Sequence, residues 1–293
     1  MKIARYQHEG KENYGIMEPA RLISLLSLAK RFKTHLPNKI DAFIADENAQ
    51  KTAETLFKKA NKNELDAAAI PLSEARLLAP IASPPKILCL GLNYKTHVAE
   101  TKAVLPEEPV IFMKPHTAIA GPNQKIIKRP FVKELDYEGE LAIVIGKKAK
   151  DVPASDALSC VFGYTILNDV SARDFQFKGS QWTPGKSFDT FAPTGPCIVT
   201  SKELPDPGNL AVRTWVNGEL RQDGNTRDMI FNVAQIIYHL SRVMTLEPCD
   251  IIATGTPSGV AMAMKLPKWL KHGDVVRIEI EGIGVLENQV EER

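Results

Sequence analysis

Short apolar runs separated by polar and turn-forming residues dominate the chain after residue 85, and such runs are typical of buried β-strands. We expect strands at 87–92, 110–113, 141–145, 161–167, 197–199 and 251–253. Alternating apolar and charged residues at 276–280 predict a further strand with one face in solvent. Asn217-Gly218 favours a tight hairpin turn directly after Trp215 and Val216.

Helical periodicity is clearest from Val233 to Met244, where apolar residues recur three and four positions apart. Asn232 can cap the first turn, and Gln235 stands at the capping-box position. We therefore expect a helix that packs its apolar stripe into the core.

Prolines divide the chain into two parts of different character. Ala79-Pro80 and Ser83-Pro84-Pro85 discourage regular structure, so we place a domain boundary there. The predicted small domain spans residues 1–80, in which 22–28 and 41–60 favour helices and nothing suggests chemistry. The strand-rich domain spans residues 81–293.

Composition narrows the possible partners. The 293 residues are 44% hydrophobic, and 37 Lys and Arg stand against 35 Asp and Glu. A net charge of +2 provides no broad field for nucleic acid or anionic lipid, and the brief basic cluster at 147–150 has no interleaved aromatic residues. No apolar run approaches the roughly 20 residues of a membrane span, and the first residues lack a signal-peptide core. We expect a soluble, cytoplasmic protein without nucleic-acid or membrane partners.

The cysteines and histidines argue against a soft-metal site. Cys89, Cys160, Cys197 and Cys249 are too widely spaced for a zinc site or a dense disulfide framework, so we expect reduced and mostly buried thiols. None of the six histidines stands at HxxxH or HxH spacing, which argues against a histidine-rich zinc or copper site.

Acidic residues stand where two apolar strands begin or end. Glu138 and Glu140 precede the run 141–145, and in an extended chain their side chains point the same way, about 6 to 7 Å apart. Asp169 follows the run 161–167. The acids fit either a solvated edge and a turn, or an all-oxygen site for Mg²⁺ or Mn²⁺, with Ca²⁺ also possible.

Five segments together resemble the fumarylacetoacetate hydrolase superfamily, especially its acylpyruvate hydrolases and 2-hydroxyhepta-2,4-diene-1,7-dioate isomerases. The segments are 91–97 (GLNYKTH), 136–141 (DYEGEL), 168–174 (NDVSARD), 185–189 (GKSFD) and 254–259 (TGTPSG). The resemblance covers roughly residues 85–290. It implies an α+β, β-rich fold, with a mixed β-roll catalytic domain behind a smaller α/β amino-terminal domain.

The same resemblance assigns a metal site and an oligomeric state. Glu138, Glu140 and Asp169 match the family's acidic ligands of Mg²⁺ or Mn²⁺. By analogy with the family we also expect a homodimer.

The resemblance also assigns polar residues around a bound substrate. Lys186 matches the active-site lysine, and Arg173 and Gln176 match positions near the substrate. Two cations would balance the negative charge of the acids, with Arg173 binding a substrate carboxylate and Lys186 stabilising an enolate. Thr256 is a further candidate for the same carboxylate. The alternatives are a surface ion pair for Arg173 and a solvated Lys186.

His97 and Glu100 are one helical turn apart, and hydrolytic members of the family carry such a pair on a mobile lid. Glu100 would orient the imidazole of His97, which would take a proton from water. The alternative is an exposed pair in a loop.

The leading hypothesis is a metal-dependent enzyme that hydrolyses a carbon-carbon bond in an acylpyruvate-like 1,3-diketo acid. One alternative uses the same site without water, for oxaloacetate decarboxylation or isomerisation of an unsaturated 2-oxo diacid from aromatic catabolism. Another is a non-catalytic protein that binds a metal and an organic acid.

Overall fold

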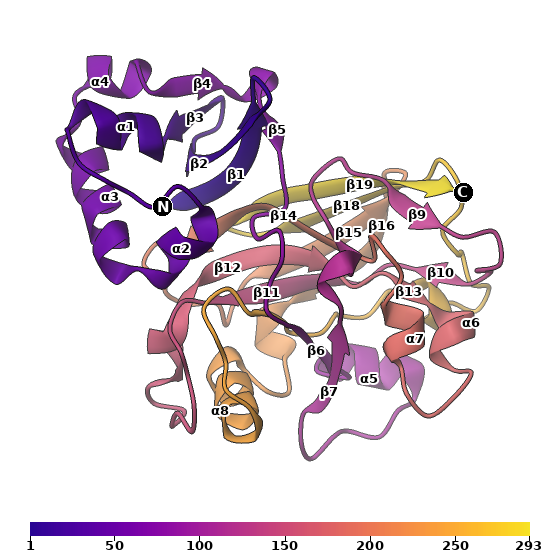
Figure 1. Ribbon diagram of the computed structural model, residues 1–293. Helices are drawn as coiled ribbons and strands as arrows, with labels where there is room; N and C mark the ends of the chain where they lie inside the picture. Colours follow the sequence, from indigo (N-terminus) through magenta and orange to yellow (C-terminus); the bar gives the residue numbers. More distant parts are fainter.

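A single sheet of 12 strands runs through the computed structural model, which describes residues 1–293 (Figure 1). Its strands are β1 (Lys2–His8), β2 (Lys11–Met17), β3 (Arg21–Ser24), β4 (Ala69–Pro71), β5 (Arg76–Leu77), β6 (Ile87–Gly91), β7 (Val110–Lys114), β8 (Ile119–Ala120), β11 (Gly139–Ile145), β12 (Val161–Asn168), β14 (Ala192–Thr200) and β17 (Ile251–Ala253). The main order is β4-β3-β2-β1-β14-β12-β11-β17-β6-β7. Because β1 pairs with β14, the sheet continues from the amino-terminal strands into the rest of the chain.

A second sheet of five strands has the order β16-β15-β18-β19-β9. Its strands are β9 (Ile126–Lys128), β15 (Ala211–Val216), β16 (Glu219–Asn225), β18 (Val275–Ile280) and β19 (Gly284–Glu292). Asn217 and Gly218 both have positive φ, 52° and 80°, and form the predicted tight turn between β15 and β16. Two short strands, β10 (Leu135–Asp136) and β13 (Ser171–Ala172), pair with each other.

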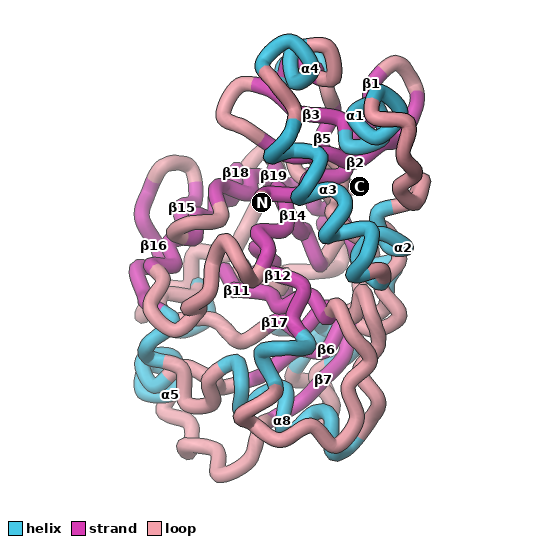
Figure 2. Tube along the Cα trace, turned by 90° about the vertical axis from the view of Figure 1, so that its left-hand side faces the viewer, coloured by secondary structure: helices cyan, strands magenta, loops and turns pink.

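Helices lie at the periphery of the sheets (Figure 2). They are α1 (Leu25–Arg31), α2 (Ile40–Ala45), α3 (Glu47–Lys59), α4 (Lys62–Asp66), α5 (Lys95–Thr101), α6 (Arg173–Gln176), α7 (Thr183–Lys186) and α8 (Val233–Val243). The predicted cap of α8 is present, because the side chain of Asn232 accepts from the backbone of Gln235 and the capping box is complete. No helix is both long and apolar enough to cross a bilayer.

The helix predictions for the first 80 residues were wrong in two details. Residues 21–24 form strand β3, and the helix begins only at Leu25, because Leu22 and Ile23 pair with β2 and β4 while Ser24 caps the helix. The predicted helix 41–60 breaks into α2 and α3 at Asp46, whose side chain caps α3.

Two hydrophobic cores lie on opposite sides of β11. Leu141 and Ile143 belong to a first core of 42 residues, and Ala142 and Val144 to a second core of 28 residues. This alternation follows from the two-residue period of a strand. Glu140 points to the same side of β11 as Ala142 and Val144. It is the second residue of the strand and belongs to the site described next.

The four cysteines are free and buried, as expected from their spacing.

Candidate active site

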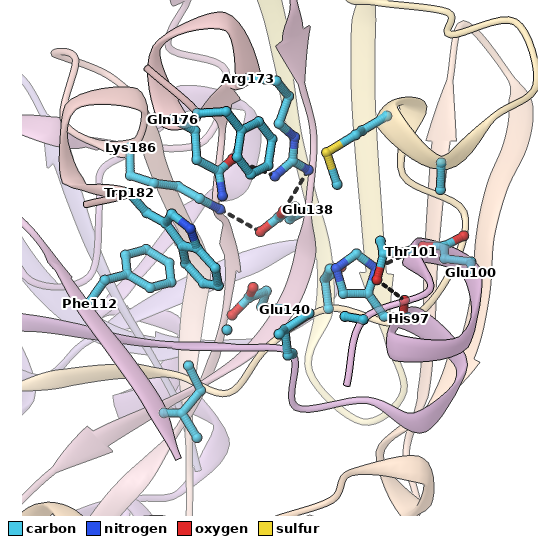
Figure 3. Close-up of a pocket in the computed structure, with 18 residues that line it drawn as sticks. His97, Glu100, Thr101, Phe112, Glu138, Glu140, Arg173, Gln176, Trp182 and Lys186 are labelled. Carbon is cyan, nitrogen blue, oxygen red and sulfur yellow. Dashed lines mark hydrogen bonds and ion pairs between the residues drawn. The ribbon is translucent and has the colours of Figure 1, made fainter. Parts of the chain in front are cut away.

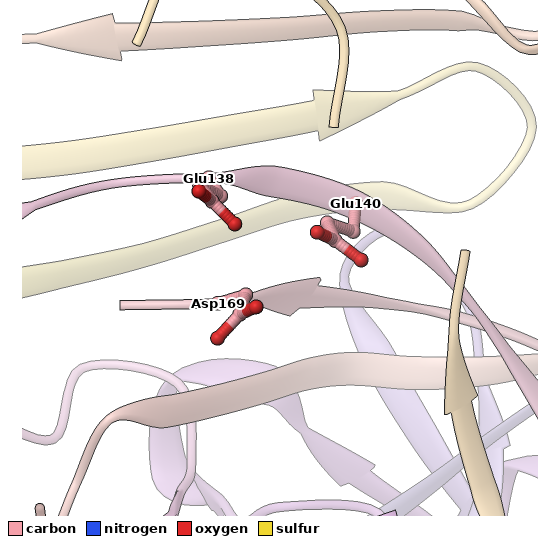
Figure 4. A group of neighbouring side chains, drawn as sticks. All are labelled: Glu138, Glu140 and Asp169. Carbon is pink, nitrogen blue, oxygen red and sulfur yellow. The ribbon is translucent and has the colours of Figure 1, made fainter. Parts of the chain in front are cut away.

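Three buried carboxylates meet where β11 begins and β12 ends. Gly139 pairs with Asn168 in the sheet, and the N–H of Asp169 donates to the carbonyl of Glu138 at 2.9 Å, which brings the two strand ends together. Oxygen atoms of Glu138, Glu140 and Asp169 all lie within 4.8 Å of one another (Figure 4). The structure therefore brings together the three acids that the sequence singled out.

Three cations surround these acids. Lys186 Nζ donates to Glu138 at 2.7 Å and to Asp169 at 2.8 Å. Lys114, at the end of β7, also donates to Asp169 and is fully buried. Arg173 donates to Glu138 at 2.6 Å and to Asp136 at 3.0 Å.

The protonation of the acids is set by burial and by their partners. Burial opposes the charge of Glu138, but Lys186 and Arg173 outweigh it and lower the pKa of this carboxyl. Glu140 contacts no cation, and its one hydrogen bond comes from the N–H of Gly255 at 2.8 Å. Burial, followed by repulsion from Asp169 and Glu138, raises the pKa of Glu140 well above its ordinary value.

This donor set fits a hard divalent cation. Counting Asp136, four carboxylates face three cationic side chains, which leaves a net charge of minus one in a buried site. Glu140 is the carboxyl without a cationic partner, and it lies beside the other two ligand candidates. Three convergent carboxylate oxygens are the ligands that Mg²⁺ and Mn²⁺ prefer, so Glu138, Glu140 and Asp169 would hold such an ion.

Arg173 lies in a network of buried polar groups. Besides its bonds to two acids, it donates to Gln176 Oε1 at 2.9 Å. Asp136 in turn accepts from the N–H groups of Ala261 at 2.8 Å and Met262 at 3.1 Å. The alternative of a surface ion pair for Arg173 is thus wrong, because the side chain is only 2% exposed.

Lys114 and Asp136 are site residues that the sequence reasoning missed. The run 110–113 ends in Lys114, and a lysine that closes an apolar strand before a proline was a usable signal. Asp136 stands within the acidic segment, but nothing in its spacing showed that backbone N–H groups 125 and 126 residues away would bind it.

His97 and Glu100 form a hydrogen-bonded pair on α5. Nδ1 of His97 lies 2.8 Å from Oε1 of Glu100, and both residues line the same cavity as Glu138 and Glu140. His97 is buried, so the alternative of an exposed pair in a loop is wrong.

The cavity has a volume of about 460 Å³ (Figure 3). Phe112 and Trp182 form one wall, with ring centroids 5.7 Å apart in an edge-to-face arrangement. A Cβ atom on Gly91 would lie 2.1 Å from the Trp182 ring, so the glycine lets the indole pack against the end of β6. Trp182 therefore both lines the cavity and packs against Gly91 and Phe112.

Thr256 also lines the cavity, but its hydroxyl is already engaged. It donates to the carbonyl of Gly139 at 3.0 Å and accepts from Gln222 at 2.7 Å. Its hydrogen is therefore not free for a substrate carboxylate.

A family model for the fumarylacetoacetate hydrolase C-terminal region matches residues 86–291, and a model described as Rv2993c-like, N-terminal, matches residues 1–80. The chain belongs to the fumarylacetoacetate hydrolase family. This confirms the family resemblance and the β-rich α+β fold expected from it.

Relatives in this family include an enzyme of known reaction. A fumarylacetoacetate hydrolase domain-containing protein 2 homolog of Dictyostelium discoideum is 45% identical over 278 residues, 91% of this chain and 90% of its own. The mitochondrial oxaloacetate tautomerase FAHD2B of Bos taurus is 48% identical over 223 residues, 75% of this chain and 71% of its own.

One similar solved structure contains a metal ion and pyruvate. The maleylpyruvate hydrolase of Sphingobium sp. SYK-6, in complex with manganese(II) and pyruvate, is 31% identical. Its TM-score is 0.80, over 100% of this chain and 99% of that one. The fumarylacetoacetate hydrolase family thus contains both a tautomerase and a hydrolase.

Proposed function

We propose that this chain is a divalent-metal-dependent enzyme that moves a proton at carbon 3 of a small 2-oxo acid, interconverting its keto and enol forms. The observation that carries the proposal is that Glu138, Glu140, two cations and a His–Glu pair line one cavity, with the buried Asp169 directly behind, bonded to Lys186. The oxaloacetate tautomerase among the relatives supports oxaloacetate as the first substrate to test.

Glu138, Glu140 and Asp169 are the proposed ligands of Mg²⁺ or Mn²⁺. The bound ion would act as a Lewis acid on the 2-oxo group and so acidify the protons of carbon 3.

His97 is the proposed general base and acid. A carboxylate can only accept hydrogen bonds, so Glu100 keeps a proton on Nδ1 of His97 and leaves Nε2 free to take the proton of carbon 3. Returning that proton to the enol oxygen or to carbon completes the exchange, and no other reactant is required.

Lys186 and Arg173 provide the positive charge that an anionic substrate requires. Burial opposes the charge of Lys186, but Asp169 and Glu138 outweigh it and raise the pKa of the ammonium group. Lys186 therefore stays charged and would stabilise the developing enolate. Arg173, with Gln176 beside it, would orient the substrate carboxylate.

Hydrolysis of a carbon-carbon bond in an acylpyruvate is the second candidate, and the His97–Glu100 pair favours it. The same imidazole would take a proton from water, which would attack the carbonyl group farther from the carboxylate. The maleylpyruvate hydrolase structure that contains manganese(II) and pyruvate supports this candidate.

The test presents the metal-stripped protein with the enol form of oxaloacetate and follows its ultraviolet absorbance, before and after Mg²⁺ or Mn²⁺ is added. Acylpyruvates are assayed in parallel, with products identified by NMR. We expect metal-dependent loss of the enol signal. His97→Ala should slow it by about 10²- to 10⁴-fold.

His239→Ala is the matched control, because His239 also pairs with a glutamate but lies outside the cavity. Release of pyruvate and a carboxylic acid from an acylpyruvate would instead support the hydrolase reaction. Carbon dioxide release that survives His97→Ala would point to decarboxylation, and metal binding without any turnover would support a binding protein.

A further inference from the structure

Glu100 uses both of its carboxylate oxygens, and each has a different partner. Oε1 lies 2.8 Å from His97 Nδ1, whereas Oε2 accepts a hydrogen bond of 2.8 Å from the backbone N–H of Gly259. Gly259 is 159 residues away in the sequence, in the loop after β17. A distant loop therefore holds the acid that orients the histidine.

Gly259 occupies a position that only glycine fits. Its φ is +109°, and a Cβ atom there would lie 1.9 Å from the carbonyl oxygen of Arg221 in β16. The hydroxyl of Tyr137 donates to its carbonyl at 2.9 Å. The N–H of Gly259 is thus aimed at Glu100 by contacts on both sides of the loop.

Hydrogen bonds from Gln222 hold the loop that contains Gly259. Gln222 is fully buried, and its amide donates to the hydroxyl of Thr256 at 2.7 Å and to the carbonyl of Pro257 at 2.9 Å. The side-chain oxygen of Gln222 accepts from the N–H of Gly139, which lies between the metal-ligand candidates Glu138 and Glu140. The orientation of Glu100 is therefore fixed relative to the acids of the site.

We propose that Gly259 is a positioning residue for His97. Its N–H occupies one oxygen of Glu100, so that the other oxygen faces Nδ1 in a fixed direction and Nε2 points into the cavity. The same bond fastens α5 to the loop after β17. This inference rests on the proposed role of His97 as the base.

The experiment compares Gly259→Ala with the full-length wild type, both loaded with Mg²⁺. Nitrogen-15 NMR of the histidine side chains reports which ring nitrogen of His97 carries the proton, with the signal assigned by its absence in His97→Ala. We expect a fixed Nδ1–H tautomer in the wild type and a mixture in the variant. The kcat should fall by about 10- to 100-fold, with KM and Mg²⁺ affinity unchanged.

Gly218→Ala is the matched control. Gly218 also has a positive φ, +80°, but nothing lies within 4 Å of a Cβ there, so it carries the backbone strain without touching the site. A wild-type tautomer and kcat in Gly259→Ala, or an equal fall of kcat in the control, would overturn the proposal.

Glu100→Gln keeps the proposal testable if Gly259→Ala does not fold. Because Gly259 donates, the amide must offer it the oxygen, which turns the NH₂ group toward Nδ1 and forces the proton of His97 onto Nε2. The reversed tautomer supports the proposal, and a retained Nδ1–H tautomer overturns it. Full activity of His97→Ala would instead refute the proposed base, whichever tautomer the spectra show.

Discussion

Glu140 lies buried against two other carboxylates, with a single backbone N–H as its hydrogen-bond partner. Burial raises its pKa, so the native state binds a proton here more tightly than the unfolded chain does. In the absence of a metal, this carboxyl therefore lowers stability as the pH rises above its ordinary pKa of 4.5.

We predict that Glu140→Gln raises the Tm of the metal-stripped protein near neutral pH by about 2–4 °C. The difference from wild type should shrink as the pH falls toward 4.5, the ordinary glutamate pKa. Saturating Mg²⁺ should reverse the order, because the ion stabilises only the chain that binds it. Thermal unfolding followed by circular dichroism checks this, with the exposed Glu9→Gln as control. A wild type that is the more stable protein without metal would contradict it.

Some residues of the site could be predicted from the sequence and others could not. Glu138 and Glu140 were predictable, because the two-residue period of a strand puts them on one face. The position of Lys114 at the end of an apolar run was visible in the sequence, but its contact with Asp169 was not, because the two residues are 55 positions apart and meet only through the order of strands in the sheet. Contacts made across a sheet follow from pairing that local patterns do not encode.

At the scale of elements, β6 and α7 form the wall of the cavity together. The Trp182 ring at the start of α7 packs directly on Gly91 at the end of β6 and against Phe112 of β7. The shape of the cavity on this side therefore depends on a glycine that has no side chain of its own to contact a substrate.

We predict that Gly91→Ala raises KM by about tenfold and leaves Mg²⁺ affinity unchanged, because the new methyl group displaces the Trp182 ring. Adding Trp182→Leu should recover part of the loss, since the smaller side chain leaves room. Steady-state kinetics with calorimetric Mg²⁺ titration measures both effects. Gly179→Ala is the control, because a Cβ there meets nothing. Additive effects of the two substitutions would count against direct contact.

Apolar runs located β6, β7, β11, β12 and β17 closely, and the alternating pattern located β18. They did not reveal β1 and β2, where charged residues such as Lys2, Arg5 and Lys11 interrupt the pattern. β1 pairs with β14 almost 200 residues later, a contact that no local window contains, and β2 pairs with β1 and β3.

At the scale of the whole molecule, the second core joins the two parts of the chain. Leu28 and Phe43 from the amino-terminal helices pack in one cluster with Phe162, Ile198 and Ile251. The rings of Phe43 and Phe162 meet edge to face with centroids 6.2 Å apart. The domain boundary at residue 80 remains a prediction, but the shared core couples the stability of both sides.

We predict that Phe43→Ala lowers the free energy of unfolding by about 3–5 kcal/mol and that residues on both sides of the boundary unfold together. All three tryptophans lie after residue 80, so their fluorescence reports only on the larger part. The unfolding transition followed by tryptophan fluorescence should therefore shift to a lower denaturant concentration, although the substitution lies in the smaller part. Phe131→Ala, at a 54% exposed residue, should shift it little. An unchanged transition in Phe43→Ala would show independent unfolding.

The central claim is that Glu138, Glu140 and Asp169 hold a divalent ion on which turnover depends. The most direct test titrates the metal-stripped protein with Mn²⁺, following binding by calorimetry and the keto–enol rate with oxaloacetate in the same samples. We predict one site per chain, a rate that rises along the binding curve, and loss of both in Glu138→Gln. A full rate after the metal has been stripped, or Mn²⁺ binding that is unchanged in Glu138→Gln, would contradict the claim.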